Sequence, residues 1–568
     1  MTELHTSKPF LWSLLAVFIL TSLAVLGLRA LVPPDEGRYA EMAREMLASG
    51  DWITTRLNGI KYFEKPPLQT WMNALSFAAF GLGDWQARLW TGLCGLGGVL
   101  LTGYAGARVF GARIGLYSAL VLGSSFFWVA CGQIDSLDMG LSGMMTLSLC
   151  ALLIAQRDDA GALERRNWML ACWAGMALAV LAKGLIGMLL PGAVLVVYTL
   201  ATRDWPLWTR LHLARGLLLF FAIATPWFVL VALKNPEQPH FFFIHEHWER
   251  FFLKTHHREG PWYYFFVMLI PGIVPWLGAL PHSLWRALGW RSAAAAAAPA
   301  GAAAAPGRFR PRLMALIWAV FIFAFFTKSS SKLPGYILPI FPALALLIAF
   351  ELDSGSRRSR IAAAGVMALV GAALLAFVPF MPGLAHYPGE GDLLRAYQPW
   401  VIAAGFVALV GGALALLYAR QMQRDLTVLV LALAGFASTQ LILAGFAPYG
   451  AQRAGMALLP AIKAELGPDT VIYSVGTYEQ SLTFYLERTV VLVDYLDEFS
   501  FGLQQQPELA IPTVPAFVAQ WTRDAAAGKR AIAILDPAVF TDLQQKGVPM
   551  RVVARDARRT VIANDVHP

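Results

Sequence analysis

The segment between residues 33 and 67 concentrates ionisable side chains beside a long apolar stretch. It reads PPDEGRYAEMAREMLASGDWITTRLNGIKYFEKPP, with Asp35 and Glu36 after one Pro-Pro pair and Glu64 and Lys65 before another. Ionisable groups held close to hydrocarbon are costly, so this cluster predicts a functional site. A helix that begins after the first proline pair would place Asp35 at its N-terminus, where the helix dipole favours a carboxylate. Asp35 is therefore either a helix cap or a functional acid.

Later segments carry further charges at the edges of apolar runs. GQIDSLDMG brings two acids to the end of an apolar run, and we favour a functional role for Asp138 over simple capping. Lys183, in LAKGLIG, either extends to the membrane surface or points into a cavity to meet a phosphate. TKSSSKLPGYILP adds Lys332 and Tyr336. Cations of this kind neutralise the phosphate of a lipid-linked leaving group, while carboxylates orient a sugar.

The segment 233–261 interleaves aromatic residues with histidines, and its composition favours a helix at the membrane interface. His245 and His247 together with Glu64 form a candidate site for a divalent metal such as zinc. A His-x-His pair with one carboxylate is a weak pattern, so interfacial histidines without a metal are the favoured interpretation. We expect no cofactor to be required, and any metal site to be non-catalytic.

The composition places the chain among polytopic membrane proteins. Hydrophobic residues make up 57% of its 568 residues and charged residues only 14%, and the mean hydropathy is +0.55. The net charge of +9 is explained by basic cytoplasmic loops, so we expect no nucleic-acid partner. The four cysteines lie in or beside apolar stretches and are interpreted as small core residues. Motifs for nucleotide hydrolysis or acyl transfer are absent from the sequence.

About 13 apolar segments are long enough to cross a membrane, beginning with an uncleaved first helix over 10–32. Every second connecting loop is rich in arginine, which places that set of loops and the N-terminus in the cytoplasm. The alternation places the segments with candidate site residues outside. Segment 67–82 would break the alternation if it crossed the membrane, so it is predicted to be a helix at the outer interface or a shallow helix. The predicted spans are 10–32, 86–107, 113–131, 138–156, 168–183, 185–202, 212–233, 262–285, 312–327, 334–351, 360–380, 399–419 and 425–447.

The composition changes near residue 450. Short β-branched runs such as DTVIYSV and RAIAILD then alternate with helical stretches such as 514–527, which predicts a small α/β domain. We therefore expect a transmembrane domain over 1–449, with interfacial segments at 33–85 and 233–261, and an α/β domain outside the membrane over 450–568. The alanine-rich run 293–306 is interpreted as a linker.

Several long motifs closely resemble those of the lipid A 4-amino-4-deoxy-L-arabinose (aminoarabinose) transferases, which are membrane glycosyltransferases of the GT-C fold. They extend over residues 33 to 340 and read DEGRYAEMAREMLASGDWI, YFEKP, the LD of SLDMG, AKG, IHEHWERF with HHREGPWYY, PWLG and KLPGYIL. The acidic pair is shared with protein O-mannosyltransferases, whereas YFEKP with KLPGYIL favours the aminoarabinose branch. Met139 stands where a proline is common in relatives, which predicts a small local backbone difference without loss of activity.

The resemblance implies transfer of aminoarabinose from undecaprenyl phosphate to lipid A phosphates on the periplasmic face of a Gram-negative inner membrane. The product would be lipid A with less negative charge, which would bind polymyxin and other cationic peptides more weakly and so confer resistance to them. The resemblance also implies roles for individual residues. Asp35 and Asp138 would act at the reaction centre. Lys65, Lys183 and Arg38 would hold the donor phosphate, Lys332 would assist, and Tyr39, Tyr62 and Tyr336 would line the site.

We further expect an inverting single displacement by a monomer surrounded by membrane lipids. One alternative is a transferase that moves a polyprenyl-phosphate sugar to protein or to another glycan. A less favoured alternative is a polyprenyl lipid flippase, which would more often place its charges near the middle of the membrane.

Overall fold

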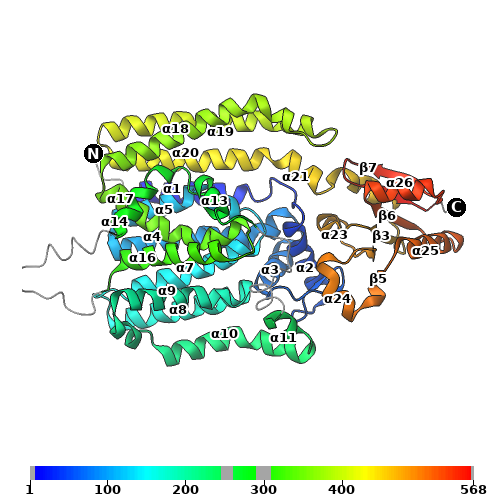
Figure 1. The fold of residues 1–568 in the computed structure, drawn as a ribbon, viewed down its shortest axis with the longest axis horizontal. Helices are drawn as coiled ribbons and strands as arrows, with labels where there is room; N and C mark the ends of the chain where they lie inside the picture. The colour runs from blue at the N-terminus through cyan, green and yellow to red at the C-terminus, as the bar shows by residue number, and fades with distance from the viewer. Residues whose placement is uncertain (1–6, 245–259, 289–308, 565–568) are drawn as a thin grey trace, which may run out of the picture. The chain divides into compact units, whose positions relative to one another are not determined.

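The computed structural model describes residues 7–244, 260–288 and 309–564, which form two compact units. The first unit contains residues 1–26, 89–379 and 399–444, and it is the helical part of the molecule. The second contains residues 27–88, 380–398 and 445–568. Helix α4 (Asp84–Phe110) and helix α19 (Glu390–Arg420) each continue from one unit into the other. Figure 1 shows the elements of both units in sequence colours.

The first unit consists of helices because an apolar backbone segment in lipid must satisfy its own hydrogen bonds. Its helices besides α4, α19 and a few short turns are α1 (Lys8–Ala24), α5 (Ala112–Ser124), α6 (Phe126–Cys131), α7 (Leu137–Ala155), α8 (Ala162–Lys183), α9 (Ile186–Thr202), α10 (Leu213–Lys234), α13 (Tyr264–Gly272), α14 (Leu280–Leu288), α16 (Pro311–Lys328), η5 (Pro334–Ile340), α17 (Phe341–Ser354), α18 (Arg357–Phe377) and α20 (Arg424–Gly445).

Every predicted apolar segment coincides with a helix or a pair of helices, but the number of membrane crossings is not confirmed. Among the described residues, eight helices are long and apolar enough to span a membrane, or nine if the bent pair Tyr264–Gly272 and Trp276–Leu288 is one span. Lys8–Ala24 and Ile186–Thr202 are shorter apolar helices. The first helix ends at Ala24 rather than continuing to residue 32, because the chain turns there.

Helices α7 and α17 form the centre of the first unit. Of the residues in the most apolar stretch of α7, 83% are buried, and the corresponding share for the span containing α17 is 89%. Helix α7 packs against α8, and α17 packs against α5 and α16. Small residues permit close packing: a Cβ on Gly175 of α8 would lie 2.8 Å from the backbone nitrogen of Ser148 in α7. The close contact of α7 with α8 fixes the positions of the polar side chains at their ends.

The second unit begins with α2 (Asp35–Ser49), a two-stranded hairpin of β1 (Arg56–Leu57) and β2 (Ile60–Lys61), and α3 (Leu68–Phe80). Helix α2 starts directly after the first proline pair, as predicted, and ends at Gly50, whose φ of 68° suits glycine. Helix α3 confirms the predicted helix within 67–82. The hairpin was not predicted, because its strands are two residues long.

The C-terminal part of this unit confirms the predicted α/β domain. Within the described residues its sheet has the order β5-β4-β3-β6-β8-β7, in which β5, β4, β3 and β6 are parallel and β8 is antiparallel to its two neighbours, β6 and β7. The strands are β3 (Val471–Val475), β4 (Val491–Val493), β5 (Ala510–Ile511), β6 (Ala531–Leu535), β7 (Arg551–Arg555) and β8 (Thr560–Ala563). The helices are α21 (Ala447–Arg453), α22 (Leu459–Glu465), α23 (Gln480–Leu486), α24 (Ser500–Gln505), α25 (Val514–Ala526) and α26 (Pro537–Gln545).

Candidate active site

Three predicted site residues of the first unit meet at one end of α7 and α8. Asp138 lies in the first turn of α7, and Lys183 is the last residue of α8. The Lys183 ammonium forms an ion pair and hydrogen bond with the Asp138 carboxylate. It also lies 4.6 Å from the centre of the Tyr336 ring, a distance suited to a cation–π interaction. The side chains of Lys183 and Asp138 are 12% and 19% exposed, so the pair is largely but not fully enclosed.

A glycine brings the KLPGYIL segment against this pair. A Cβ built on Gly335 would lie 2.5 Å from Oδ2 of Asp138, which is closer than real Cβ atoms approach. Any other residue at position 335 must therefore displace the Asp138 carboxylate or the η5 backbone. This close approach explains why glycine precedes Tyr336 in the motif.

Lys332 is engaged differently from Lys183. Its ammonium donates hydrogen bonds to the carbonyl oxygens of Phe326, Thr327 and Ser329 at 3.0, 2.6 and 2.7 Å. These carbonyls lie at the C-terminal end of α16, where the helix dipole favours a cation. Its contact with a donor phosphate remains a prediction. In this structure the carbonyl oxygens at the end of α16 bind the Lys332 ammonium.

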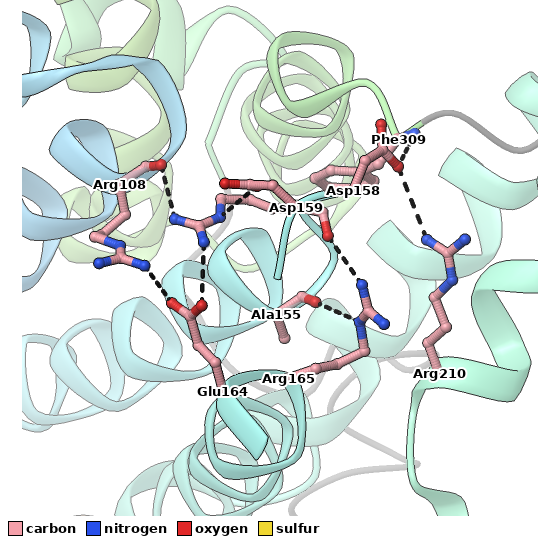
Figure 2. A network of polar contacts seen from close by, with 9 residues as sticks. Arg108, Ala155, Asp158, Asp159, Glu164, Arg165, Arg210 and Phe309 are labelled. Atoms are coloured by element: carbon pink, nitrogen blue, oxygen red, sulfur yellow. Dashed lines mark hydrogen bonds and ion pairs between the residues drawn. The ribbon is translucent and has the colours of Figure 1, made fainter. Parts of the chain in front are cut away.

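The opposite end of α7 and α8 carries a second charged network, shown in Figure 2. Arg157 is 3.1 Å from Asp159 and 3.2 Å from Glu164, and it donates to the Arg108 carbonyl at 2.9 Å. The remaining contacts join Arg108 to Glu164, Arg165 to the carbonyls of Ala155 and Arg157, and Asp158 to both Arg210 and the Phe309 backbone. Four loops that the sequence predicts on the same side of the membrane therefore meet at one end of this unit.

In the second unit, α2 places Asp35 and Arg38 one turn apart. Arg38 Nη1 donates to Asp35 Oδ1 at 2.9 Å, and Arg38 Nε is 2.5 Å from Glu498 Oε2. The Asp35 side chain is 54% exposed, whereas those of Arg38 and Glu498 are 12% and 7% exposed. Asp35 is thus an accessible carboxylate beside a fixed guanidinium group. Simple capping does not require that arrangement.

The neighbouring Glu36 has a structural role. Its carboxylate accepts hydrogen bonds from Arg88 at 2.6 and 2.9 Å and from the Val32 backbone at 2.9 Å. Arg88 also donates to the carbonyls of Arg29 and Ala30. Burial alone would raise the pKa of Glu36, but Arg88 lowers it below the ordinary value. This ionised pair fixes the chain that leads into α2.

The first loop contains four further predicted residues, of which Tyr39 and Tyr62 interact electrostatically with Arg38 and the other two are Glu64 and Lys65. Tyr39 and Tyr62 are buried, and burial together with the charge of Glu64 raises the pKa of Tyr62 well above its usual value. Tyr62 is therefore neutral at physiological pH. The Lys65 ammonium donates to the Glu64 carbonyl at 2.7 Å, and both residues are partly exposed. Their proposed contacts with substrate remain predictions.

The predicted metal site is untested, because His245 and His247 lie outside the described residues. Among the residues that the structure describes, no group of three or more His, Cys, Asp or Glu side chains is arranged to hold a metal ion. The four cysteines are free, and three of them are buried, consistent with the predicted core role.

Sequence reasoning missed three positions that shape these clusters: Arg88, Gly335 and Glu498. Arg88 lies within a predicted span, and a charged residue next to hydrocarbon could have indicated a buried partner of opposite charge. Gly335 lies within the KLPGYIL motif, and nothing in the sequence distinguished it from the other residues of that motif. Glu498 lies in the C-terminal domain, and no pattern in the sequence connected it with Arg38.

Comparisons with known proteins show which family the chain belongs to. The model of the aminoarabinose transferase C-terminal domain matches residues 458–564, and that of dolichyl-phosphate-mannose-protein mannosyltransferases matches residues 9–244. An undecaprenyl phosphate-α-4-amino-4-deoxy-L-arabinose arabinosyl transferase from Edwardsiella ictaluri is 30% identical over 87% of both chains. The chain belongs to the aminoarabinose transferase family. A relative from Aeromonas salmonicida with the same name is 31% identical over 70% of this chain and 71% of its own.

A solved structure extends the family assignment to the whole fold. ArnT from Cupriavidus metallidurans, crystallised bound to undecaprenyl phosphate, is 42% identical, covers 98% of both chains and has a TM-score of 0.90. Its apo form matches with a TM-score of 0.89. The predicted GT-C fold with a C-terminal α/β domain is thereby confirmed, and the chain is a multi-pass membrane glycosyltransferase of the aminoarabinose transferase family.

Proposed function

We propose that this chain transfers 4-amino-4-deoxy-L-arabinose from undecaprenyl phosphate to the phosphate groups of lipid A. The observation that carries the proposal is the similarity over 98% of the chain to an ArnT crystallised with undecaprenyl phosphate. The names of the curated relatives give the sugar and its carrier. Lipid A as the acceptor comes from the family resemblance. Modification of its phosphates would reduce their negative charge and weaken the binding of polymyxin and other cationic peptides.

The two clusters supply the groups that this chemistry requires. Asp35 and Asp138 orient the sugar and stabilise positive charge that develops at its anomeric carbon. Lys183, Lys65 and Arg38 stabilise the departing lipid phosphate, and Tyr336 lies beside the Lys183 ammonium. The ion pair of Lys183 with Asp138 orients the lysine side chain before the donor arrives.

The reaction is a single displacement with inversion. A phosphate oxygen of lipid A attacks the anomeric carbon, the bond from that carbon to the donor phosphate breaks, and undecaprenyl phosphate leaves with the electron pair. The acceptor is already an anion, so no strong general base is needed. No metal takes part in these steps.

The orientation follows from the positive-inside rule. The arginine-rich loops that meet in Figure 2 are assigned to the cytoplasm, which puts the Asp138 end of α7 on the periplasmic side of the inner membrane. The N-terminus is then cytoplasmic and the C-terminal domain periplasmic. The protein acts as a monomer among membrane lipids.

Replacing Asp35 and Lys65 tests the proposal. Asp35→Asn and Lys65→Ala are each expected to lower aminoarabinose on lipid A by about 100-fold, because each removes a charge from the reacting groups. Mass spectrometry of lipid A from cells that carry the full chain as their only transferase measures the effect. Asp542→Asn, on the exposed face of α26, is the matched control and retains full modification. Near-normal modification in both test variants contradicts the site assignment.

The match of residues 9–244 to the mannosyltransferase model favours one alternative, in which the acceptor is a protein or another glycan. Purified protein supplied with labelled donor and with lipid A or membrane protein separates the two. Label on lipid A alone supports the proposal, and label on protein supports the alternative.

A further inference from the structure

Two segments of the C-terminal domain reach the start of α2, and the sheet topology explains why they do so together. Strands β3 and β4 are parallel neighbours, with Val475 opposite Val493. Segments that follow the carboxyl ends of parallel neighbours leave the sheet at the same edge. The segment after β3 leads into α23, which begins at Gln480, and the segment after β4 contains Glu498 in η8 (Asp497–Phe499).

The first contact joins Glu498 to the guanidinium group that faces Asp35. Glu498 Oε2 lies 2.5 Å from Arg38 Nε, while Oε1 accepts a hydrogen bond from Gln480 Nε2 at 2.7 Å. The carboxylate is therefore held between a charged partner and a neutral donor from the adjacent strand connection. Burial raises the pKa of the Glu498 carboxyl above its ordinary value, although the neighbouring Arg38 opposes that shift.

The second contact holds the backbone around Asp35. Ser481 Oγ donates to the Leu31 carbonyl at 2.7 Å, and the Leu31 N–H donates to the Tyr485 hydroxyl at 2.7 Å. A Cβ on Gly37 would lie 2.5 Å from the Ser481 backbone nitrogen, so α2 and α23 are in direct backbone contact. Helix α23 thus fixes both the chain before Asp35 and the helix turn after it.

We propose that Glu498 is a positioning residue of the transferase, through which the C-terminal domain orients Arg38 against Asp35. The inference rests on the proposed function and assigns a task to a domain that carries none of the reacting groups. A guanidinium group is planar, so a carboxylate that fixes Nε also fixes the direction in which Nη1 meets Asp35. Without Glu498, Arg38 keeps its charge but loses the constraint on its plane.

The test is a double-mutant cycle in the purified full-length protein, with undecaprenyl phosphate-aminoarabinose as donor and lipid A as acceptor. Glu498→Gln keeps the size of the side chain and an oxygen for Gln480 but removes the charge opposite Arg38. We expect it to lower kcat about 10-fold with KM for the donor changed less than about twofold. In an Arg38→Lys background, which removes the planar fork, the same change should cost less than about twofold.

Two controls separate positioning from stability. Asp524→Asn removes another buried carboxylate of the C-terminal domain, which accepts a hydrogen bond from Tyr473, and it should leave kcat unchanged. Glu498→Asp, which restores a charge, should recover part of the lost activity. The inference is overturned if Glu498→Gln has wild-type kcat, if its effect equals that of Asp524→Asn, or if the effects of Glu498→Gln and Arg38→Lys are independent. Failure of the wild-type protein to transfer aminoarabinose instead contradicts the proposed function.

Discussion

The two ends of the α7–α8 pair carry the same types of side chain in opposite arrangements. At the end where the arginine-rich loops meet (the loop end), Arg157 bonds to two carboxylates and a carbonyl. Its neighbours Arg108 and Arg165 bond to a carboxylate and to a backbone carbonyl, respectively (Figure 2). At the other end, one lysine meets one aspartate and an aromatic ring, with both charged side chains still partly exposed. About 25 Å of helix separates Asp138 from Ala155.

The difference separates charges that hold loops from charges that we propose to contact the substrate. Multiple bonds to each arginine distribute its charge and fix the loop, so the loss of one bond is tolerated. A single, partly open pair has few protein partners to replace a lost charge, and it remains available to an anion. The same contrast distinguishes Glu36, enclosed by Arg88 and the Val32 backbone, from the exposed Asp35 beside it.

Replacing Lys183, at the end of α7 and α8 that carries Asp138 (the open end), should have the largest effect on transfer. Lys183→Ala is expected to lower transfer to lipid A by about 100-fold, because the departing phosphate loses a cation and Asp138 loses its partner. Labelled-donor assays on purified protein measure the rate. Lys546→Ala, which breaks an exposed pair with Asp542, is the control and should be neutral. A Lys183→Ala variant within a few-fold of wild type would end the distinction between the two ends.

Crowding the open end without removing a charge should have a smaller effect. Gly335→Ala adds a methyl group where Asp138 Oδ2 lies, so the carboxylate or the η5 backbone must shift. We expect transfer to fall about 10-fold, since displacements on this scale misplace reacting groups. Gly161→Ala serves as the control, because nothing lies within 4 Å of a Cβ there. Unchanged activity in Gly335→Ala shows that Asp138 tolerates displacement.

Disrupting the loop end should change stability rather than activity. Arg157→Gln removes the ion pairs with Asp159 and Glu164 but leaves the Arg108–Glu164 pair in place. Transfer should stay within about twofold of wild type, and Tm should fall by a few degrees. Thermal unfolding in detergent and the transfer assay are measured on the same preparation. A large loss of activity at unchanged Tm contradicts the assignment of this network to loop fixation.

Glu45 in α2 lies beside Glu41 and Arg44 and should make the stability of the protein depend on pH. Burial and the neighbouring Glu41 raise the pKa of Glu45 from 4.5 to about 8, although the Gly59 N–H and Arg44 oppose the shift. Because the folded protein keeps a proton that the unfolded chain loses, this contribution to stability is complete below pH 4.5 and is lost as the pH rises through about 8.

Replacing Glu45 with glutamine should therefore flatten the pH dependence of Tm. The wild-type Tm is expected to fall between about pH 5 and pH 8 by more than that of Glu45→Gln, with transfer at a fixed pH little changed. Asp542→Asn, at an exposed position, should keep the wild-type slope. Equal slopes in all three proteins contradict the assignment to Glu45.

The sequence predicted the parts of the fold that depend on long patterns. Apolar runs located the helices, and β-branched runs located the main strands of the C-terminal sheet, because both signals extend over several residues. The start of α2 at Asp35 followed from the proline pair and the acid after it. The end of α1 at Ala24 was missed, because the residues after it remain apolar although the chain turns.

The candidate site could be predicted only as separate fragments. Asp138, Lys183 and Tyr336 were named from their local contexts, and the structure brings them into contact because α7 packs along α8 and η5. The contact of Arg38 with Glu498 depends on the strand order of a domain that starts hundreds of residues later. Pairing between distant segments leaves no local pattern in the sequence. The contact of Glu498 with Arg38 and that of Arg88 with Glu36 could therefore not be predicted.

The hydrogen bond from Ser481 to Leu31 joins residues 450 positions apart, which has a consequence for biosynthesis. At about 5–20 residues per second, the ribosome needs roughly 20–90 seconds to add the residues between them. During that interval the acidic loop has been made while the helix that fixes it has not. A nascent or truncated chain therefore contains Asp35 and Arg38 without the contacts from Ser481 and Glu498. If Glu498 positions Arg38 as proposed, the protein reaches full activity only when its last domain has folded.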